Sequence, residues 1–490
     1  MDRTSRKTHW ELIRQADDFA AKVAKTVTED PHRLGYHIMA PSGWLNDPNG
    51  LLYYSGEYHV FYQYHPYSSQ WGPMHWGHVK SKDLVHWEHL PTALAPSEPY
   101  DQNGCFSGSA VDDNGILTLI YTGNVHTESK RAQVQCIAVS TDGINFSKSA
   151  DNPVIGEAPK ACSPDFRDPK VWRHGDSWYM VVGYREGKIG KALLYESRDL
   201  RKWKYVGVLA DNDGSLGYMW ECPDFFPLDG KHILIISPMG VPGHKSIYLV
   251  GDFDYRIGWF DWQHYAELDY GHDFYAPQTL AGPSGRRILF GWMNMWGREQ
   301  PTAEKGWAGA LTIPRELRLL PDGTLSMLPV SELRALRKDH VRVENIEVSG
   351  EGNDYLASLA GDQLEIVAVF ELAGCTATEF GLEVRCSPEG DQGTSIIYHR
   401  RNGELIVDLN RSGAGVGGRT GGPLKLHEKD TLELRIFIDR SSVEVFGNEG
   451  RIALSSRIYP NPNSNGVKPF ATDGSVRIRR FDAWKLNSIW

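Results

Sequence analysis

Three acidic residues lie in short polar motifs, each of which precedes an apolar segment. They are Asp47 in WLNDPNG, Asp168 in FRDPKV and Glu221 in WECPDF. A cavity that holds several carboxylates is costly, because burial and like charge both raise carboxyl pKa values. Such a cost is typical of sites where two acids must differ in protonation at one pH. Glycoside hydrolysis has this need, since one carboxylate attacks or activates water while another protonates the leaving oxygen.

Each motif taken alone also has a plainer interpretation. Asn-Asp-Pro-Asn-Gly favours a tight turn. Arg167 beside Asp168 is typical of a local ion pair, and Glu221 beside Cys222 indicates little by itself. The catalytic interpretation therefore depends on where the three motifs lie relative to one another.

The motifs belong to a repeat that runs through the first two thirds of the chain. Its markers Asp47, Ser107, Asp168, Glu221 and Tyr275 are separated by 60, 61, 53 and 54 residues. A second motif recurs in phase as SKDLVHW (81–87), STDGINF (140–146) and SRDLRKW (197–203). Five strand-rich units at this spacing predict a five-bladed β-propeller. The first strand of each blade lines the axis, so we expect the polar motifs to converge on one axial cavity.

The rest of the chain has other patterns. Leu432, Leu434, Ile436 and Ile438 alternate with polar residues, which predicts a strand with one buried face in an antiparallel β-sandwich. Near the N-terminus an amphipathic helix is indicated by the apolar residues Trp10, Leu12, Ile13, Phe19, Ala20 and Val23. We therefore expect an all-β protein with four segments: an N-terminal helical extension (1–32), the propeller (33–328), a linking helix capped by Ser331 (329–344) and the sandwich (345–490).

Composition narrows the possible partners. The formal net charge of −10 disfavours nucleic acid and anionic membranes. No apolar run approaches the ~18–20 residues that span a bilayer, and the N-terminus lacks the apolar core of a secretory signal. The six scattered cysteines predict reduced thiols and a cytoplasmic location; they are Cys105, Cys136, Cys162, Cys222, Cys375 and Cys386.

Other chemistries lack their usual residue patterns. The acidic and amide residues around Asp47 do not have the spacing of a calcium loop. No histidine pair has zinc spacing around 59–65 or 75–89, and no G-x-S-x-G elbow occurs. We expect no metal and no cofactor.

Together the motifs closely resemble the family 32 glycoside hydrolases, the β-fructofuranosidases. WLNDPNG is similar to their nucleophile motif, with Leu45 where the family usually has Met. FRDPKV, WECPDF, FSGSAV, WGHVKSKDLVHW and RIFIDRSSVEVFGN also match, and these matches extend over both expected domains. The resemblance implies a five-bladed propeller followed by a β-sandwich, in agreement with the repeat.

The resemblance also implies roles for individual residues. Asp47 would be the nucleophile and Glu221 the general acid/base, while Asp168 would bind fructosyl hydroxyls and stabilise the transition state. Arg167 is expected to keep Asp168 charged, and Cys222 to tune Glu221. The substrate-binding positions implied are Trp44, Leu45, Asn46, Gln63, Trp71, Phe106, Ser107, Arg167, Cys222, Tyr275 and Trp296.

Several substrates remain open. A small sugar, sucrose or sucrose 6-phosphate, agrees with a cytoplasmic protein, whereas inulin, levan or fructosyl transfer are alternatives. A sugar-binding propeller without catalysis is disfavoured because Asp47 and Glu221 are both present. Phosphate recognition would need basic groups at the cavity mouth, for which His65, His75, Arg298 and Lys305 are candidates. We expect a monomer or homodimer in which the sandwich braces the propeller.

Overall fold

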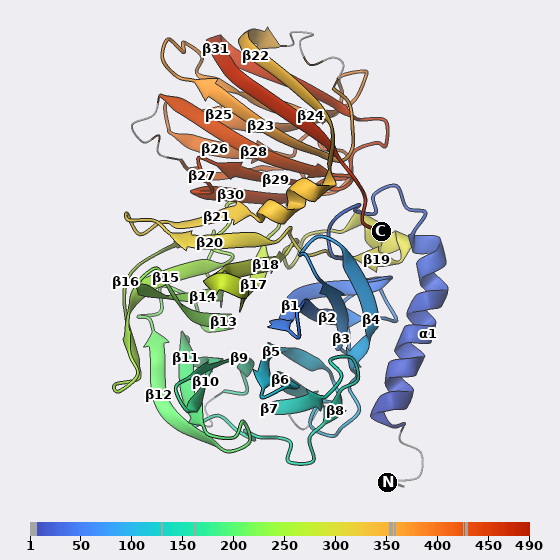
Figure 1. The fold of residues 1–490 in the computed structure, drawn as a ribbon, viewed down its shortest axis with the longest axis vertical. Helices are drawn as coiled ribbons and strands as arrows, with labels where there is room; N and C mark the ends of the chain where they lie inside the picture. Colours follow the sequence, from blue (N-terminus) through green and yellow to red (C-terminus); the bar gives the residue numbers. More distant parts are fainter. Residues whose placement is uncertain are drawn as a thin grey trace.

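The computed structural model describes residues 7–128, 131–160, 163–351, 356, 359–424, 426 and 430–490. Figure 1 shows five blades around an axis in one half of the molecule, a sandwich in the other, and helix α1 along one side of the propeller. Among the described helices, none has the length and apolar character needed to cross a membrane. The described cysteines are all free thiols, and Cys162 lies outside the described residues.

The predicted propeller and sandwich are confirmed. Each blade is an antiparallel sheet whose strands follow in chain order, and the first strands contact one another in a closed ring. The first two blades contain β1 (Gly43–Tyr54), β2 (Glu57–His65), β3 (His75–Ser81) and β4 (Trp87–Leu94), then β5 (Cys105–Asp113), β6 (Ile116–His126), β7 (Arg131–Ser140) and β8 (Ser147–Lys148). The third and fourth contain β9 (Phe166–His174), β10 (Ser177–Glu186), β11 (Ile189–Ser197) and β12 (Trp203–Asp211), then β13 (Met219–Leu228), β14 (Lys231–Met239), β15 (Ile247–Asp254) and β16 (Trp259–Glu267).

The fifth blade closes the ring. It contains β17 (Tyr275–Ala281), β18 (Arg287–Trp292), β20 (Arg315–Leu319) and β21 (Leu325–Pro329), with 3-10 helices at Pro283–Gly285 and Pro301–Lys305. The short strand β19 (Trp307–Ala308) leaves this blade and pairs in parallel with Gly43 and Trp44 of β1. Strand β19, which follows the first four blades in the chain, thus belongs to the sheet of the first blade.

The second repeated motif forms the turn between the third and fourth strands of a blade. In three blades a serine hydroxyl donates to an aspartate two residues later, and that carboxylate accepts from the backbone N–H groups that follow; the pairs are Ser81–Asp83, Ser140–Asp142 and Ser197–Asp199. Such local side-chain bonds stabilise tight turns. The repeat therefore encodes both the axial motifs and the outer turns.

The N-terminal helix α1 (His9–Val27) starts with a capping box between Thr8 and Glu11. It buries His9, Ile13, Ala16, Ala20 and Val27. Trp10 and Phe19, which the apolar pattern placed on the inner face, are 42% and 38% exposed. Nine residues separate the two rings, which places them on opposite sides of a helix that turns by about 100° per residue. Helix α1 packs against β4.

The segment after the propeller differs from the expected linking helix. A 3-10 helix covers only Ser331–Leu336, Ser331 does not cap it, and the long strand β22 (Arg337–Glu351) follows at once. The backbone of Arg337 is extended and pairs with Leu486 in a sheet. This long-range strand pairing ends the helix at Leu336, although the local sequence favours a longer helix. The interdomain connection is therefore short.

The sandwich contains ten strands around one apolar core. The long strand β31 (Gly466–Leu486) pairs with β24 (Glu379–Cys386) near its start and with β23 (Leu364–Glu371) near its end. Strand β22 pairs with β31 along most of its length, from Phe470 to Leu486. Leu432, Leu434, Ile436 and Ile438 are fully buried, as their alternation predicts. The remaining strands are β23 (Leu364–Glu371), β24 (Glu379–Cys386), β25 (Thr394–His399), β26 (Glu404–Asp408), β27 (Arg419–Pro423), β28 (Thr431–Asp439), β29 (Ser442–Gly447), β30 (Ile452–Arg457) and β31 (Gly466–Leu486).

The late motif RIFIDRSSVEVFGN lies at the interface between propeller and sandwich. His37, which precedes β1, contacts Asp439 through Nδ1 at 2.8 Å and Glu444 through Nε2 at 2.9 Å. Asp439 also accepts from the backbone N–H groups of Gly35 and Tyr36. Arg315 on β20 completes the cluster by donating to Glu444. This motif therefore attaches the sandwich to both ends of the propeller chain.

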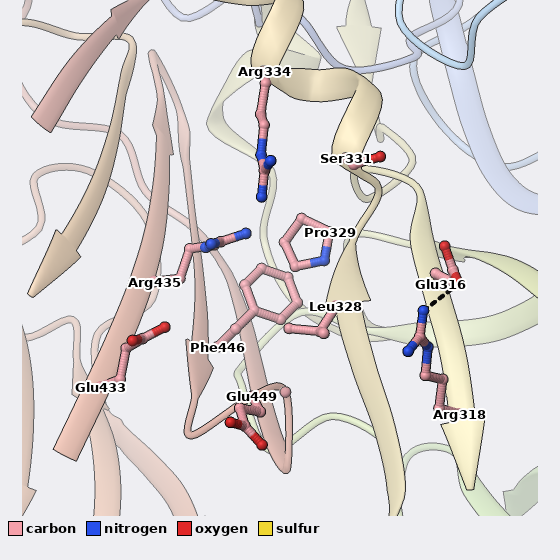
Figure 2. Close-up of a pocket in the computed structure, with 11 residues that line it drawn as sticks. Glu316, Arg318, Leu328, Pro329, Ser331, Arg334, Glu433, Arg435, Phe446 and Glu449 are labelled. Carbon is pink, nitrogen blue, oxygen red and sulfur yellow. Dashed lines mark hydrogen bonds and ion pairs between the residues drawn. The ribbon is translucent and has the colours of Figure 1, made fainter. Parts of the chain in front are cut away.

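A cavity of about 370 Å³ lies at the same interface, on the side of β20 and β21. Figure 2 shows Leu328, Pro329 and Phe446 at its apolar centre, with arginine and glutamate side chains around them. Arg318 donates to Glu316 at 3.2 Å on one wall. None of the residues that line this cavity belongs to an axial motif.

Candidate active site

The axial strands share one irregularity that aims their side chains at the axis. In each blade the pairing between the first and second strands shifts register within the polar motif. Asp168, Cys222 and Ala276 have positive φ values of 64°, 49° and 50° at these points. Bulges of this kind redirect side chains and are common beside active sites. The five motifs thus present their polar residues at one level of the axis.

A cavity of about 420 Å³ opens where the motifs meet. Its lining includes the three predicted catalytic acids together with most of the predicted substrate-binding residues. The lining residues are Asn46, Asp47, Gln63, Trp71, Phe106, Ser107, Asn124, His126, Arg131, Gln133, Arg167, Asp168, Glu221, Met239 and Trp296. Residues from four blades and from the loop after β18 therefore form a single site.

Asp47 is held from two sides. Ser107 Oγ donates to Oδ2 at 2.6 Å, and Asn46 Nδ2 donates to Oδ1 at 3.0 Å. Burial raises the pKa of Asp47 to about 6, with the charge of Glu221 adding to the shift and the two hydrogen bonds opposing it. The carboxylate is consequently ionised above about pH 6 and fixed in orientation.

Asp168 lies beside Asp47 across the thiol of Cys222. Its Oδ2 accepts from Cys222 N at 2.9 Å, and Cys222 Sγ is 3.6 Å from both Asp168 Oδ2 and Asp47 Oδ2. Burial raises the pKa of Asp168 to about 7, and the charges of Glu221 and Asp47 add to it. Arg167 lowers this pKa but does not outweigh burial.

Arg167 binds a different carboxylate from the one that the sequence suggests. Its Nη2 and Nε donate to Glu221 Oε1 at 2.9 and 3.1 Å, and its Nη1 donates to Asp165 at 3.1 Å. The local ion pair that the adjacency of Arg167 and Asp168 suggests is replaced by contacts of the guanidinium with Glu221 and Asp165. The charge of Arg167 still lowers the pKa of Asp168. Tyr275 OH donates to Glu221 Oε2 at 2.6 Å, so both oxygens of Glu221 are held.

Aromatic rings form two walls of the cavity. Trp71 is 49% exposed and meets the Phe106 ring edge-on, while Trp296 is 42% exposed and stacks on Trp44. Large exposed rings at a cavity mouth suit stacking on the apolar face of a sugar. The polar floor and aromatic walls together can orient a small carbohydrate.

Four predicted substrate-binding residues lie behind the wall rather than on it. Leu45 is fully buried, and Trp44 supports Trp296 while its Nε1 donates to Asn46 Oδ1 at 2.8 Å. Cys222 and Tyr275 are buried against the carboxylates. These four side chains position the residues that line the cavity.

The four basic residues considered for phosphate recognition do not line the cavity. His75 is buried, and burial lowers its pKa to about 3. Arg298 pairs with Asp273 at 2.8 Å near the interface. Other lining residues have no motif in the sequence; they are Asn124, His126, Arg131, Gln133 and Met239. A weak signal was available, since Asn124 is the last residue of the predicted strand segment ILTLIYTGN and lies on β6 (Ile116–His126).

Comparisons with known proteins agree with this geometry. Residues 37–329 match the glycosyl hydrolases family 32 N-terminal domain, and residues 332–485 match the family 32 C-terminal domain. The chain is 41% identical to a sucrose-6-phosphate hydrolase of Zymomonas mobilis over 96% of each chain. It is 38% identical to a levanase of Bacillus subtilis, covering 94% of this chain and 71% of the levanase. The solved GH32 beta-fructofuranosidase of Bombyx mori superimposes with a TM-score of 0.86 at 37% identity, over 97% of this chain and 98% of that one.

Proposed function

Because the chain belongs to family 32 of the glycosyl hydrolases, we propose that it hydrolyses terminal β-D-fructofuranosides, with sucrose and sucrose 6-phosphate as substrates. The observation that carries this proposal is the meeting of Asp47, Asp168 and Glu221 at one cavity with different hydrogen-bond partners. The Zymomonas relative, named a sucrose-6-phosphate hydrolase, supports the choice of substrate.

The proposed reaction retains the configuration at the anomeric carbon. Asp47 attacks that carbon while Glu221 transfers its proton to the departing glycosidic oxygen, which leaves a covalent fructosyl-enzyme. Glu221 then accepts a proton from water as the water oxygen attacks the anomeric carbon and Asp47 departs. The ionised state of Asp47 above about pH 6 supports its role as nucleophile.

The remaining polar groups would hold the fructosyl ring. Asp168, Asn46 and Gln63 all line the cavity and offer acceptors or donors to hydroxyl groups. Gln63 is itself fixed, because its Nε2 donates to the carbonyl of Cys105 at 2.9 Å. Fixed partners of this kind stabilise a transition state without reorganising during the reaction.

The roles of the two main carboxylates are tested by Asp47→Asn and Glu221→Gln. Each change keeps the side-chain shape and is expected to lower kcat by several orders of magnitude, because it removes the nucleophile or the proton donor. The measurement is turnover of sucrose by purified protein with an unchanged circular dichroism spectrum. Asp252→Asn, which alters an exposed carboxylate on β15, is the control that should keep wild-type turnover. Near-normal turnover in either test variant would remove that residue from its role.

The substrate is tested by comparing kcat/KM for sucrose, sucrose 6-phosphate and a short inulin oligomer. We expect the two small sugars to be preferred. Equal or better use of the oligomer would overturn the small-substrate part of the proposal and favour a fructan hydrolase, an alternative that the levanase relative supports. Product analysis at high sucrose concentration separates hydrolysis from fructosyl transfer, since transfer yields longer fructosides.

A further inference from the structure

Two side chains on the cavity wall have no part in the reaction proposed above. His126 and Arg131 are cross-strand partners at the end of the β6–β7 pair, and both line the cavity. Both are exposed, with 49% of the Arg131 side chain accessible. They bring cationic and hydrogen-bonding groups to the mouth of a site whose floor is acidic.

A chain of ion pairs places Arg131 on the side of the leaving group. Glu221 Oε1 pairs with Arg167 at 2.9 Å, Arg167 pairs with Asp165 at 3.1 Å, and Asp165 pairs with Arg131 at 2.8 Å. Glu221 is the group that protonates the departing oxygen in the proposed reaction. The wall that leads from Glu221 to Arg131 therefore begins at the group that protonates the departing oxygen.

Arg131 is held on this wall by a carboxylate. Asp165 is almost buried and pairs with three guanidinium groups, those of Arg131, Arg167 and Arg185. Arg131 and Arg167 line the cavity, whereas Arg185 does not. A guanidinium held by a carboxylate on one edge can still present its other edge to a phosphate.

We infer that Arg131 and His126 form a subsite for a phosphate monoester on the leaving sugar. The inference rests on the proposed function, since it assigns the 6-phosphate of the glucosyl unit to this wall. Arg131 supplies a charge-assisted pair to the phosphate oxygens, and His126 supplies a ring N–H from the facing strand. In this proposal the preference between sucrose and sucrose 6-phosphate depends on residues of the β6–β7 pair and not on the three catalytic carboxylates.

The test is the ratio of kcat/KM for sucrose 6-phosphate to kcat/KM for sucrose. Arg131→Ala is expected to lower this ratio by about 10- to 100-fold, the usual cost of removing a charged hydrogen-bond partner. Arg131→Lys restores part of it, because it returns the charge without the planar fork, and His126→Ala lowers it by a smaller factor. The matched control is Arg185→Ala, which removes another arginine from Asp165 outside the cavity lining and should leave the ratio within about twofold.

A binding measurement separates recognition from turnover. Glucose 6-phosphate and glucose are compared as inhibitors of sucrose hydrolysis, in the wild type and in Arg131→Ala. We expect the variant to weaken inhibition by glucose 6-phosphate by at least tenfold, with a smaller change for glucose.

Three results would overturn the subsite: an unchanged ratio in Arg131→Ala, equal shifts for the two inhibitors, or a wild type that hydrolyses sucrose but not its 6-phosphate. In each case sucrose turnover that depends on Asp47 and Glu221 would leave the fructofuranosidase activity standing. Loss of that dependence would instead overturn the proposed function itself.

Discussion

At the scale of single residues, Asp47 and Asp168 are two buried carboxyl groups that differ in the neighbours that donate hydrogen bonds to them. Both are raised in pKa chiefly by burial, to about 6 and about 7. Asp47 accepts from a hydroxyl and an amide, whereas Asp168 accepts from the backbone N–H of Cys222. An ionised nucleophile is needed for attack, so kcat/KM should fall as the pH drops through about 6.

Ser107→Ala tests how much its hydroxyl contributes to that ionisation. The hydrogen bond from Ser107 lowers the pKa of Asp47, so its loss raises the pKa and moves the acid limb of the kcat/KM profile to higher pH. A shift of about one to two pH units is expected, since a hydrogen bond to a charged group contributes ~1.5–3 kcal/mol and a pH unit corresponds to ~1.4 kcal/mol. The measurement is the pH dependence of kcat/KM for sucrose.

The control for this change is Ser140→Ala, which removes a hydroxyl from Asp142 in an outer turn. Its acid limb should coincide with that of the wild type. A limb that stays in place in Ser107→Ala, or moves to lower pH, would contradict the assignment of the limb to Asp47.

At the scale of elements, the bulge in β5 requires a residue without a side chain. A Cβ on Gly108 would lie 2.0 Å from the carbonyl oxygen of Ile120 and 2.8 Å from the Cα of Tyr121. Neither is the end of a flexible side chain, so the strand itself would have to move. The movement would displace Ser107, which precedes Gly108 and holds Asp47.

Gly108→Ala is therefore expected to lower both stability and turnover. We expect a loss of about 1–3 kcal/mol in the free energy of unfolding, as for other changes that overpack a core, and a fall in kcat beyond tenfold. Denaturant unfolding and sucrose turnover measure the two effects. Gly207→Ala on β12 is the matched control, because its Cβ would meet nothing within 4 Å; if both variants behaved alike, the close approach at Gly108 would not matter.

The elements also show what the sequence can predict. The blades were predictable because their motifs recur: Asp47, Asp168 and Glu221 each precede an apolar strand segment, and SKDLVHW recurs as an outer turn. The position of Arg131 at the cavity was not predictable, because it depends on the pairing of β6 with β7. The partner of Arg167 could not be predicted from the adjacent Asp168, since the guanidinium binds Glu221, which lies 54 positions further along the chain. The prediction of a helix after the propeller was wrong for a similar reason, because long-range pairing with β31 makes the chain a strand from Arg337 onward.

At the scale of the whole molecule, His37 couples propeller and sandwich. Both ring nitrogens face carboxylate oxygens, from Asp439 and Glu444, and all three side chains are buried. Burial opposes a charged ring, but the hydrogen bonds and charges of the two carboxylates outweigh it and raise the pKa of His37. Arg315 adds a second positive charge at Glu444. This cluster supports the proposal that residues 345–490 brace the propeller.

The stability of the protein should depend on the charge of this ring. The pKa of His37 is raised on folding, so its contribution is complete below about pH 6.5, the value for a free histidine, and is lost as the pH rises through the folded value. His37→Ala removes the imidazolium that the buried carboxylates of Asp439 and Glu444 share, and within the described part of the chain only Glu444 keeps an ion-pair partner, Arg315. This loss should cost about 3–5 kcal/mol at pH 6. Its unfolding midpoint should also lack the alkaline decline assigned to this residue.

Unfolding midpoints between about pH 5 and 9 test this dependence. His86→Ala is the control, because His86 pairs with Asp83 on the surface, where an ion pair contributes ~0–1 kcal/mol. A wild-type curve that rises with pH above 6.5, or a His37→Ala curve parallel to it, would contradict the role of the charged ring.

The contact between His37 and Asp439 joins residues that lie 402 positions apart in the chain. Translation delivers the N-terminal end first, so Asp47 leaves the ribosome well before the partners that hold its surroundings in place. The parallel pairing of β19 with β1 must wait for Trp307 and Ala308, and the attachment of the segment before β1 must wait for Asp439. A nascent chain can therefore carry all three carboxylates and still lack an assembled site. A premature stop codon after the last blade would leave every catalytic residue in the product but remove the partner that secures the beginning of the chain.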